Sequence, residues 1–349
     1  MKNTLICLII LLVPMLTIAQ SQDTTKTNLK NNKLANNLYN ESLALFEVQN
    51  YAEAIKMINK AIALNPEFSK AYYNRASYQL QTGNLDEAIT DYTTAIKLNA
   101  SAQTYSGRGY VYLIKNEAEL ALKDFSSAIV SNPEYAKAYY YRGCAHALKD
   151  NLSQALIEFD RAIEIQPDLA AAYNERGSIH LQENKLELAK NDLTKAITFD
   201  PALAVAYCNK GKVAELEKNY ESALEFLTAA IKIKPDYYEA LNFRGKVKHR
   251  NEDYEGAVED YNKAIAIKAD FAYALNNRGN AKYMLGDLTG AISDFSLAIE
   301  VNPDYGEAYL NRGVVKEMQR DEKGACRDWS NAAELGVTAA LNYTNNQCE

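Results

Sequence analysis

The sequence predicts an all-α solenoid of about nine helix-turn-helix repeats. Columns of identical or small residues recur along the chain with a period of about 34. One column reads Ala54, Ala88, Ala121, Ala155, Ala189, Ala223, Ala257, Ala291 and Ala325, and a second alanine follows each of these by seven residues. A proline column reads Pro66, Pro133, Pro167, Pro201, Pro235 and Pro303. A period of this length is typical of stacked helical repeats.

The first residues resemble a targeting segment. Lys2 precedes an apolar run from Leu5 to Val13, and small residues up to Ala19 offer a cleavage site. We therefore expect residues 1–19 to be a secretory signal peptide, with an uncleaved membrane anchor as the alternative. Residues 20–34 are polar and should form a flexible lead-in. No later stretch is long and apolar enough to span a bilayer, so the mature chain should be periplasmic or extracellular.

Residues 35–337 should contain the nine repeats. Their expected bounds are 35–68, 69–101, 102–135, 136–169, 170–203, 204–237, 238–271, 272–305 and 306–337. In each repeat a first helix carries a small-residue column, which is glycine from Gly109 onward, and a second helix carries both alanines and ends at the proline. Small residues on facing helices let their axes approach closely. A single helix pair cannot bury its own apolar face, so the repeats must stack.

Composition and charge narrow the class of partner. The chain has 38 Lys and Arg against 45 Asp and Glu, a net charge of −7, and these charges are scattered rather than clustered. An acidic surface without a basic patch argues against nucleic acid as a partner. No phosphate-binding loop, nucleophile motif or histidine-based dyad is visible, so we expect no enzyme activity, no cofactor and no metal.

The fourth repeat carries a recognisable set of residues, namely Tyr139, Arg142, Gly143, Ala155, Phe159, Ala162 and Pro167. This set resembles the tetratricopeptide motif, and the resemblance covers residues 35 to about 337. It implies a right-handed superhelix whose concave wall binds peptides. Two departures from the family pattern are systematic. Tyrosine or leucine replaces the usual tryptophan, and arginine replaces the usual leucine before the glycine.

The arginine column has an acidic counterpart sixteen residues later. The predicted pairs are Arg75 with Asp91, Arg108 with Asp124, Arg142 with Glu158, Arg176 with Asp192, Arg244 with Asp260, Arg278 with Asp294, and Arg312 with Asp328. The first and sixth repeats lack both members. Since the arginines lie on the packing side of the helix, a buried charge there needs a partner, and we expect ion pairs that join the two helices of each repeat. The alternative is a groove of arginines for a polyanion.

Polar and aromatic residues fall on the arc of the first helices that should line the concave wall. They are Tyr140, Tyr141, Asn174, Asn209, Lys212, Asn242, Lys246, Asn276, Asn277, Asn280 and Asn311. A row of asparagines can hydrogen-bond the backbone of an extended peptide. Some relatives clamp a terminal carboxylate with Lys and Asn, which Asn209, Lys212, Asn242 and Lys246 could do here. The alternative is that these are ordinary solvated residues.

Cysteine and histidine positions add one structural prediction. Cys326 and Cys348 are the best disulfide candidates, because residues 338–349 could fold back as a cap over the last repeat. Cys144 and Cys208 lie too far apart to meet. His146 and His180 should pack in the core rather than bind a metal.

The sequence therefore predicts an exported scaffold that holds an extended protein segment or peptide. A carbohydrate-binding or polymer-export accessory protein of the cell envelope is the alternative, suggested by tyrosines near the groove. The sequence predicts no particular oligomeric state.

Overall fold

The structure is a computed structural model that describes residues 28–348, apart from the side chains at 345–347. Within these residues the chain is helical throughout and contains no strand. The expected signal peptide, residues 1–19, and residues 20–27 of the expected lead-in lie outside the described part. Among the residues described, no helix is both long and apolar enough to cross a membrane.

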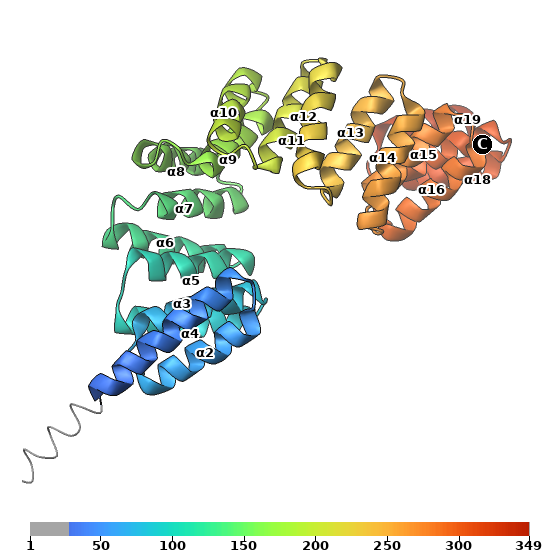
Figure 1. Cartoon of the computed structure of the whole chain (residues 1–349). Coiled ribbons are helices and arrows are strands. Elements are labelled where there is room, and N and C mark those ends of the chain that lie inside the picture. Colours follow the sequence, from blue (N-terminus) through green and yellow to red (C-terminus); the bar gives the residue numbers. More distant parts are fainter. Residues whose placement is uncertain (1–27, 349) are drawn as a thin grey trace, which may run out of the picture. The chain divides into compact units, whose positions relative to one another are not determined.

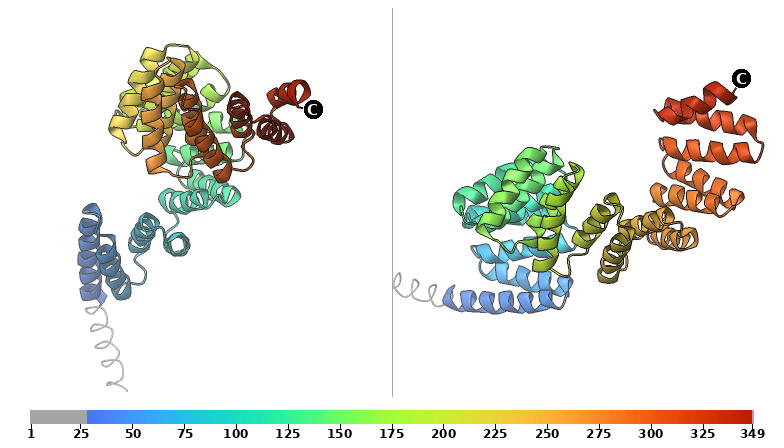
Figure 2. Two further views of the ribbon diagram at one scale, coloured as in Figure 1. Left: turned by 90° about the vertical axis from the view of Figure 1, so that its right-hand side faces the viewer. Right: turned by 90° about the horizontal axis from the view of Figure 1, so that it is seen from above.

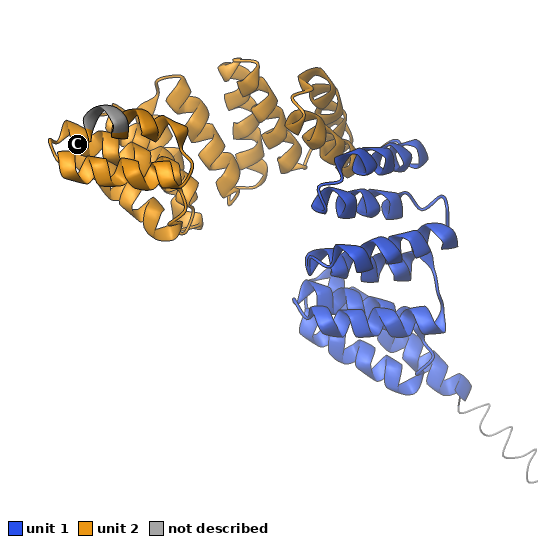
Figure 3. Cartoon of the chain, turned by 180° about the vertical axis from the view of Figure 1, so that it is seen from behind, with its two compact units in different colours: residues 1–167 blue, residues 168–349 orange. Residues whose placement is uncertain are grey.

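Helix contacts divide the chain into two compact units, shown in Figure 3 as residues 1–167 (unit 1) and 168–349 (unit 2). The described helices of unit 1 are residues 28–47, α2 (Tyr51–Leu64), α3 (Ser69–Gln81), α4 (Leu85–Leu98), α5 (Ala102–Ile114), α6 (Ala118–Ser131), α7 (Ala136–Leu148) and α8 (Leu152–Ile165). Those of unit 2 are α9 (Ala170–Gln182), α10 (Leu186–Phe199), α11 (Ala204–Leu216), α12 (Tyr220–Ile233), α13 (Tyr238–Arg250), α14 (Tyr254–Ile267), α15 (Ala272–Met284), α16 (Leu288–Val301), α17 (Gly306–Met318), α18 (Glu322–Glu334) and α19 (Thr338–Gln347).

Each repeat is a pair of adjacent helices, as Figures 1 and 2 show. Both alanine columns of the second helices are fully buried in every repeat. The glycine of the first helix lies against a large side chain of the second helix. A β-carbon at Gly143 would come within 2.6 Å of the Phe159 ring, and one at Gly313 within 2.5 Å of the Trp329 indole. These contacts explain why the column contains only small residues, as the sequence analysis predicts.

The turn between the two helices has one conformation in every repeat. Its central residue has a positive φ, and the column reads Gln49, Gly83, Asn116, Asp150, Asn184, Lys218, Glu252, Gly286 and Arg320. The residue after it donates its backbone N–H to a carbonyl five positions earlier, as in the 2.9 Å bond from Asn219 to Ala214. This is the Schellman motif, which ends a helix by satisfying its last carbonyl groups. It sets the sharp reversal that brings the helices of a repeat together.

The first helix begins earlier than expected. Residues 28–34, which we assigned to the flexible lead-in, are helical and continuous with the first helix of repeat one. Leu29 and Leu34 are exposed, whereas Ala35 is fully buried. The two extra helical turns therefore bury little apolar surface. They can still form, because adding residues to an existing helix needs no new nucleus and costs little free energy. Composition alone could not show this.

Candidate functional site

Seven arginines of the first helices contact acidic side chains of the second helices. The shortest nitrogen–oxygen distances are 2.6–2.8 Å in all seven predicted pairs. The arginine side chains are 15–23% exposed and the carboxylates at most 9% exposed. Six carboxylates are aspartates that accept from both Nε and Nη2 of their arginine. These arginines are therefore neutralised inside the protein, which disfavours the polyanion groove.

The same arginines also reach the preceding repeat. Nη1 donates to a polar side chain on the second helix of that repeat, and the acceptors include Asn59, Thr93, Ser126, Thr228, Asn262 and Ser296. Six of the seven arginines, Arg75, Arg108, Arg142, Arg244, Arg278 and Arg312, therefore join three helices. In the sixth repeat Lys210 lies 4.7 Å from the centre of the Phe226 ring, and burial lowers the pKa of this lysine. The arginine column is consequently part of the scaffold rather than of a binding site.

The remaining side chains of the first helices form what we call the first-helix face of unit 2. It consists of the residues of α9, α11, α13, α15 and α17 that do not pack on second helices. Three of the predicted groove asparagines are not available there. Asn174, Asn209 and Asn276 are only 2%, 5% and 4% exposed. The prediction that they offer open amides is therefore wrong, because helical periodicity gives the direction of a side chain but not how closely the next helix covers it.

These asparagines instead hydrogen-bond one another between neighbouring repeats. Nδ2 of Asn209 donates to Oδ1 of Asn174 at 3.2 Å, and Asn311 donates to Asn276 at 3.0 Å. Asn277 donates to Asn242 at 3.1 Å, and this pair is only partly buried. In each pair the donor lies 35 residues after the acceptor. That spacing was visible in the sequence and could have identified the pairs.

Cations gather where α11 and α13 meet. The ammonium groups of Lys212 and Lys246 lie 5.8 Å and 5.0 Å from the centre of the Phe243 ring. Lys246 is 3.7 Å from a carboxylate oxygen of Glu215, and Arg250 contacts the same oxygen. Glu215 is 2% exposed. We call Lys212, Phe243, Lys246, Arg250 and Glu215 the cationic cluster.

Three exposed apolar residues share one repeat position, which Arg250 of the cluster interrupts, and they were missed in the sequence. Leu216, Met284 and Met318 occupy equivalent positions at the ends of α11, α15 and α17, and they are 48%, 48% and 54% exposed. Arg250 holds the same position on α13. Solvent-exposed large apolar side chains at repeat spacing indicate a contact surface. The 34-residue period that revealed the alanine columns could have found them. Asn280, on α15, is half-buried on the same face.

The first helices of unit 1 present a different chemistry. The ring centre of Tyr141 lies 5.0 Å from that of Tyr110 and 5.0 Å from that of Tyr140. Burial raises the pKa of Tyr141 to about 12, so its hydroxyl is neutral at physiological pH. Tyr110 and the neighbouring Ile114 are 37% and 47% exposed. This aromatic surface carries two of the predicted groove residues.

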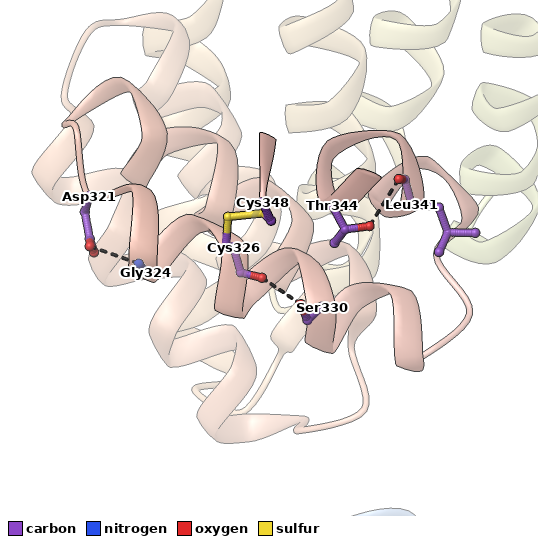
Figure 4. Close-up of a disulfide and its surroundings, with 7 residues drawn as sticks. All are labelled: Asp321, Gly324, Cys326, Ser330, Leu341, Thr344 and Cys348. Carbon is purple, nitrogen blue, oxygen red and sulfur yellow. Dashed lines mark hydrogen bonds between the residues drawn. A yellow bond between two sulfur atoms is a disulfide. The ribbon is translucent and has the colours of Figure 1, made fainter. Parts of the chain in front are cut away.

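The end of unit 2 is closed by α19. Cys348 forms a disulfide with Cys326 of α18, which Figure 4 shows, and this is the pairing predicted from the sequence. Tyr343 stacks on Trp329 with ring centres 4.7 Å apart, and Ala340 is fully buried. α19 therefore covers the apolar surface that a further repeat would otherwise cover.

The histidines lie among side chains of the helical scaffold. His180 lies 3.9 Å from the Asp192 carboxylate, and burial lowers the pKa of His146 and of His249. Among the described residues, no group of three or more His, Cys, Asp or Glu side chains is arranged to hold a metal ion.

Comparisons with known sequences agree with this architecture. Models described as tetratricopeptide repeat match residues 39–103, 136–169, 170–203, 204–237 and 272–305, and one described as TPR repeat matches 245–286. The Hsp70-Hsp90 organizing protein of Triticum aestivum is 30% identical over 102 residues, which are 29% of this chain and 18% of that protein. Tetratricopeptide repeat protein 36 of Xenopus tropicalis is 31% identical over 108 residues, which are 30% of this chain and 54% of that protein.

A solved structure extends the comparison to most of the chain. The crystal structure described as the APC/C hetero-tetramer Cut9-Hcn1 matches with a TM-score of 0.64 at 13% identity, covering 90% of this chain and 76% of that chain. At this identity the match shows the fold alone. The chain spans little more than half of the frog protein and less than a fifth of the wheat protein. The family models together match more than half of the residues, and the chain belongs to the tetratricopeptide repeat family.

Proposed function

We propose that the chain is an exported protein-interaction scaffold that holds an extended segment of a partner protein on the first-helix face of unit 2. The exposed row of Leu216, Met284 and Met318 carries this proposal. Apolar side chains at repeat spacing can contact apolar side chains of an extended segment, while Asn242, Asn277 and Asn280 bond its backbone. Related proteins with similar repeats include the Hsp70-Hsp90 organizing protein, whose name describes a role with two other proteins.

Site-specific cross-linking tests the surface. A photoreactive amino acid is placed at Met284 or Met318 in cells that make the protein, and at exposed Lys232 or Lys263 of the second helices as matched controls. We expect the same partner at both methionine positions and not at the lysines. Mass spectrometry of the linked peptide identifies the bound segment. Cross-links of equal yield at all four positions would contradict the proposal.

Export rests on the N-terminal sequence, in which Lys2 precedes an apolar run and small residues end at Ala19. Cell fractionation followed by mass spectrometry of the N-terminus tests it. We expect a chain beginning at Gln20 in the periplasmic or secreted fraction. An intact chain in the membrane fraction would support the uncleaved anchor, and an intact chain in the cytosol would contradict export.

The clustered tyrosines of unit 1 favour a second candidate function, which is carbohydrate binding. Tyr110, Tyr140 and Tyr141 offer flat apolar rings with polar hydroxyls, which suit the faces of sugar rings. Calorimetric titration with envelope glycans separates the candidates. A heat of glycan binding that is present in the wild type and absent in Tyr110→Ala, with an unchanged melting temperature, would support this function for unit 1.

A further inference from the structure

We propose that the third repeat holds a binding site for an acidic sugar, in a hollow between the start of α5 and the length of α6. The hollow has a volume of about 550 Å³. The residues that line it include Ala100, Tyr105, Lys123, Ser126, Ser127 and Val130. None of them belongs to the first-helix face of unit 2 or to the tyrosine surface of unit 1, so the site goes beyond both functions proposed above.

The fourth repeat shows what fills this space elsewhere in the chain. There the Arg161 guanidinium lies 5.9 Å from the centre of the Tyr139 ring. It also contacts carboxylate oxygens of Glu134 and Glu164, at 3.8 Å and 2.9 Å. The equivalent positions of the third repeat, 34 residues earlier, hold Ser127, Tyr105, Ala100 and Val130. The tyrosine is therefore kept, while small or apolar side chains replace the ion pairs that cover it.

Two serines of the hollow present hydrogen-bond acceptors at fixed positions. The Oγ atoms of Ser126 and Ser127 donate to the backbone carbonyls of Leu122 and Lys123, at 2.8 Å and 3.0 Å. A hydroxyl group has one proton and two lone pairs, so both oxygens can still accept. Ser126 uses one lone pair for Nη1 of Arg142, at 3.3 Å. Oxygens whose protons are already engaged suit a ligand that donates hydroxyl groups of its own.

Lys123 gives the hollow a positive charge. It is exposed, and it is the one charged side chain of the lining. Among the residues that the structure describes, its ammonium group forms no ion pair, and the equivalent residue of the fourth repeat is the uncharged Ile157. An ammonium group without a counter-ion favours a ligand that carries an anion.

A sugar ring that bears a carboxylate meets these requirements together. Its C–H face is apolar and suits Tyr105 and Val130, of which Val130 is 84% exposed. Its hydroxyl groups can donate to Ser126 and Ser127, while its carboxylate pairs with Lys123. The hollow also has the size of a small-molecule site, about 300–1,000 Å³. A neutral sugar would leave the ammonium group unpaired, and an inorganic anion would leave the apolar surface uncovered.

Saturation-transfer NMR titrations with two matched tetrasaccharides test this inference. One tetrasaccharide contains glucuronic acid, and in the other each carboxylate is reduced to a primary alcohol. Inorganic phosphate is the third probe. The titrations are run on the full chain, on Lys123→Gln, on Ser127→Arg/Val130→Glu, and on Lys263→Gln, which removes the same charge from an exposed second-helix position of unit 2. Ser127→Arg/Val130→Glu copies Arg161 and Glu164, so it should fill the hollow with side chains that the fold already accommodates.

We expect the acidic tetrasaccharide to bind the wild type and Lys263→Gln equally. In Lys123→Gln its Kd should rise about three- to fivefold, as for the loss of one exposed ion pair, and approach that of the reduced sugar. In Ser127→Arg/Val130→Glu binding should be lost while the melting temperature is kept. If that variant fails to fold, the comparison of Lys123→Gln with Lys263→Gln decides.

Four results would overturn the inference. They are no binding of the acidic sugar to the wild type, equal binding of both tetrasaccharides, displacement of the acidic sugar by phosphate at equal concentration, and binding that survives in Ser127→Arg/Val130→Glu. Binding that survives there but is lost in Tyr110→Ala would assign the sugar to the tyrosine surface instead. Cross-linking at Met284 tests the partner scaffold separately, so the two failures are distinguishable.

Discussion

Within single repeats, the length of an acidic side chain decides how well it matches its arginine. Glu158 is the one glutamate of the column, and Arg142 approaches it through Nη2 alone, at 2.8 Å. Nε of Arg142 and Oε2 of Glu158 are buried without a hydrogen-bond partner. Aspartate, one methylene shorter, accepts two bonds in the other six pairs. The column therefore contains one suboptimal pair.

Glu158→Asp should stabilise the protein. The shorter carboxylate can accept from both Nε and Nη2 of Arg142, which satisfies two buried polar atoms, and we expect a gain of about 1 kcal/mol in the free energy of unfolding. Chemical denaturation measures this difference. The reverse change, Asp192→Glu, is the control and should destabilise; a loss of stability in Glu158→Asp would contradict the explanation.

Loss of an arginine should cost more where its acid has no other cation. Asp294 also pairs with Lys282 at 2.9 Å, whereas Asp124 depends on Arg108. We expect Arg108→Met to lower the free energy of unfolding by about 2–4 kcal/mol, since it leaves a buried carboxylate unpaired, and Arg278→Met to lower it less. The double change Arg108→Met/Asp124→Leu should recover most of the loss. Equal effects of the two single changes would refute this account.

His249 should make stability depend on pH. Burial lowers its pKa, and its ring packs against Tyr254 at 5.1 Å. The unfolded chain therefore binds a proton at a higher pH than the folded chain, so the free energy of unfolding should fall as the pH drops below about 6.5. In His249→Leu this decrease should be smaller. Denaturation curves at several pH values compare the two proteins.

At the level of the helix pair, the residue with a positive φ in the connecting turn differs from repeat to repeat. Lys218, Glu252, Arg320 and Gln49 adopt positive φ values in turns where Gly83 and Gly286 do the same without strain. Asparagine and aspartate, present at three further turns, tolerate this conformation better than long side chains do. The turn column therefore differs in strain from repeat to repeat although its hydrogen bonds are the same.

Replacing a long side chain by glycine at such a turn should stabilise the protein. For Lys218→Gly we expect a gain of about 0.5–1 kcal/mol, because relief of the left-handed conformation exceeds the added entropy of the unfolded chain. Thermal denaturation measures it. Gly286→Ala is the opposite control and should lower the melting temperature.

The sequence predicted helices and their partners better than it predicted exposure. The period of 34 located the helix pairs and the ion pairs, because each depends on fixed spacing within a repeat. It did not show that Asn276 is covered by its neighbour, since that depends on how closely successive first helices approach. Nor did it show that residues 28–34 continue a helix, or that the chain divides between the fourth and fifth repeats, because both units carry the same columns.

At the scale of the whole molecule, stability is a sum over neighbouring repeats, and the chain ends matter most. The Cys326–Cys348 disulfide closes a loop with a sequence separation of 22 and ties α19 onto Trp329. We expect Cys348→Ser to lower the stability of the last repeat by about 3 kcal/mol in the chain-entropy model. Amide hydrogen exchange should accelerate in α18 and α19 and remain unchanged in α11. Uniform acceleration would contradict a local effect.

The sixth repeat interrupts the arginine–acid column of unit 2, with Lys210 over the Phe226 ring, whereas the other repeats of this unit have a bidentate Arg–Asp pair. A pulling force applied along unit 2 would therefore be resisted least by the sixth repeat. When the chain is pulled from both termini, α11 and α12 should separate from each other before the flanking helix pairs do. The sixth repeat should therefore be the first part of unit 2 to unfold under force.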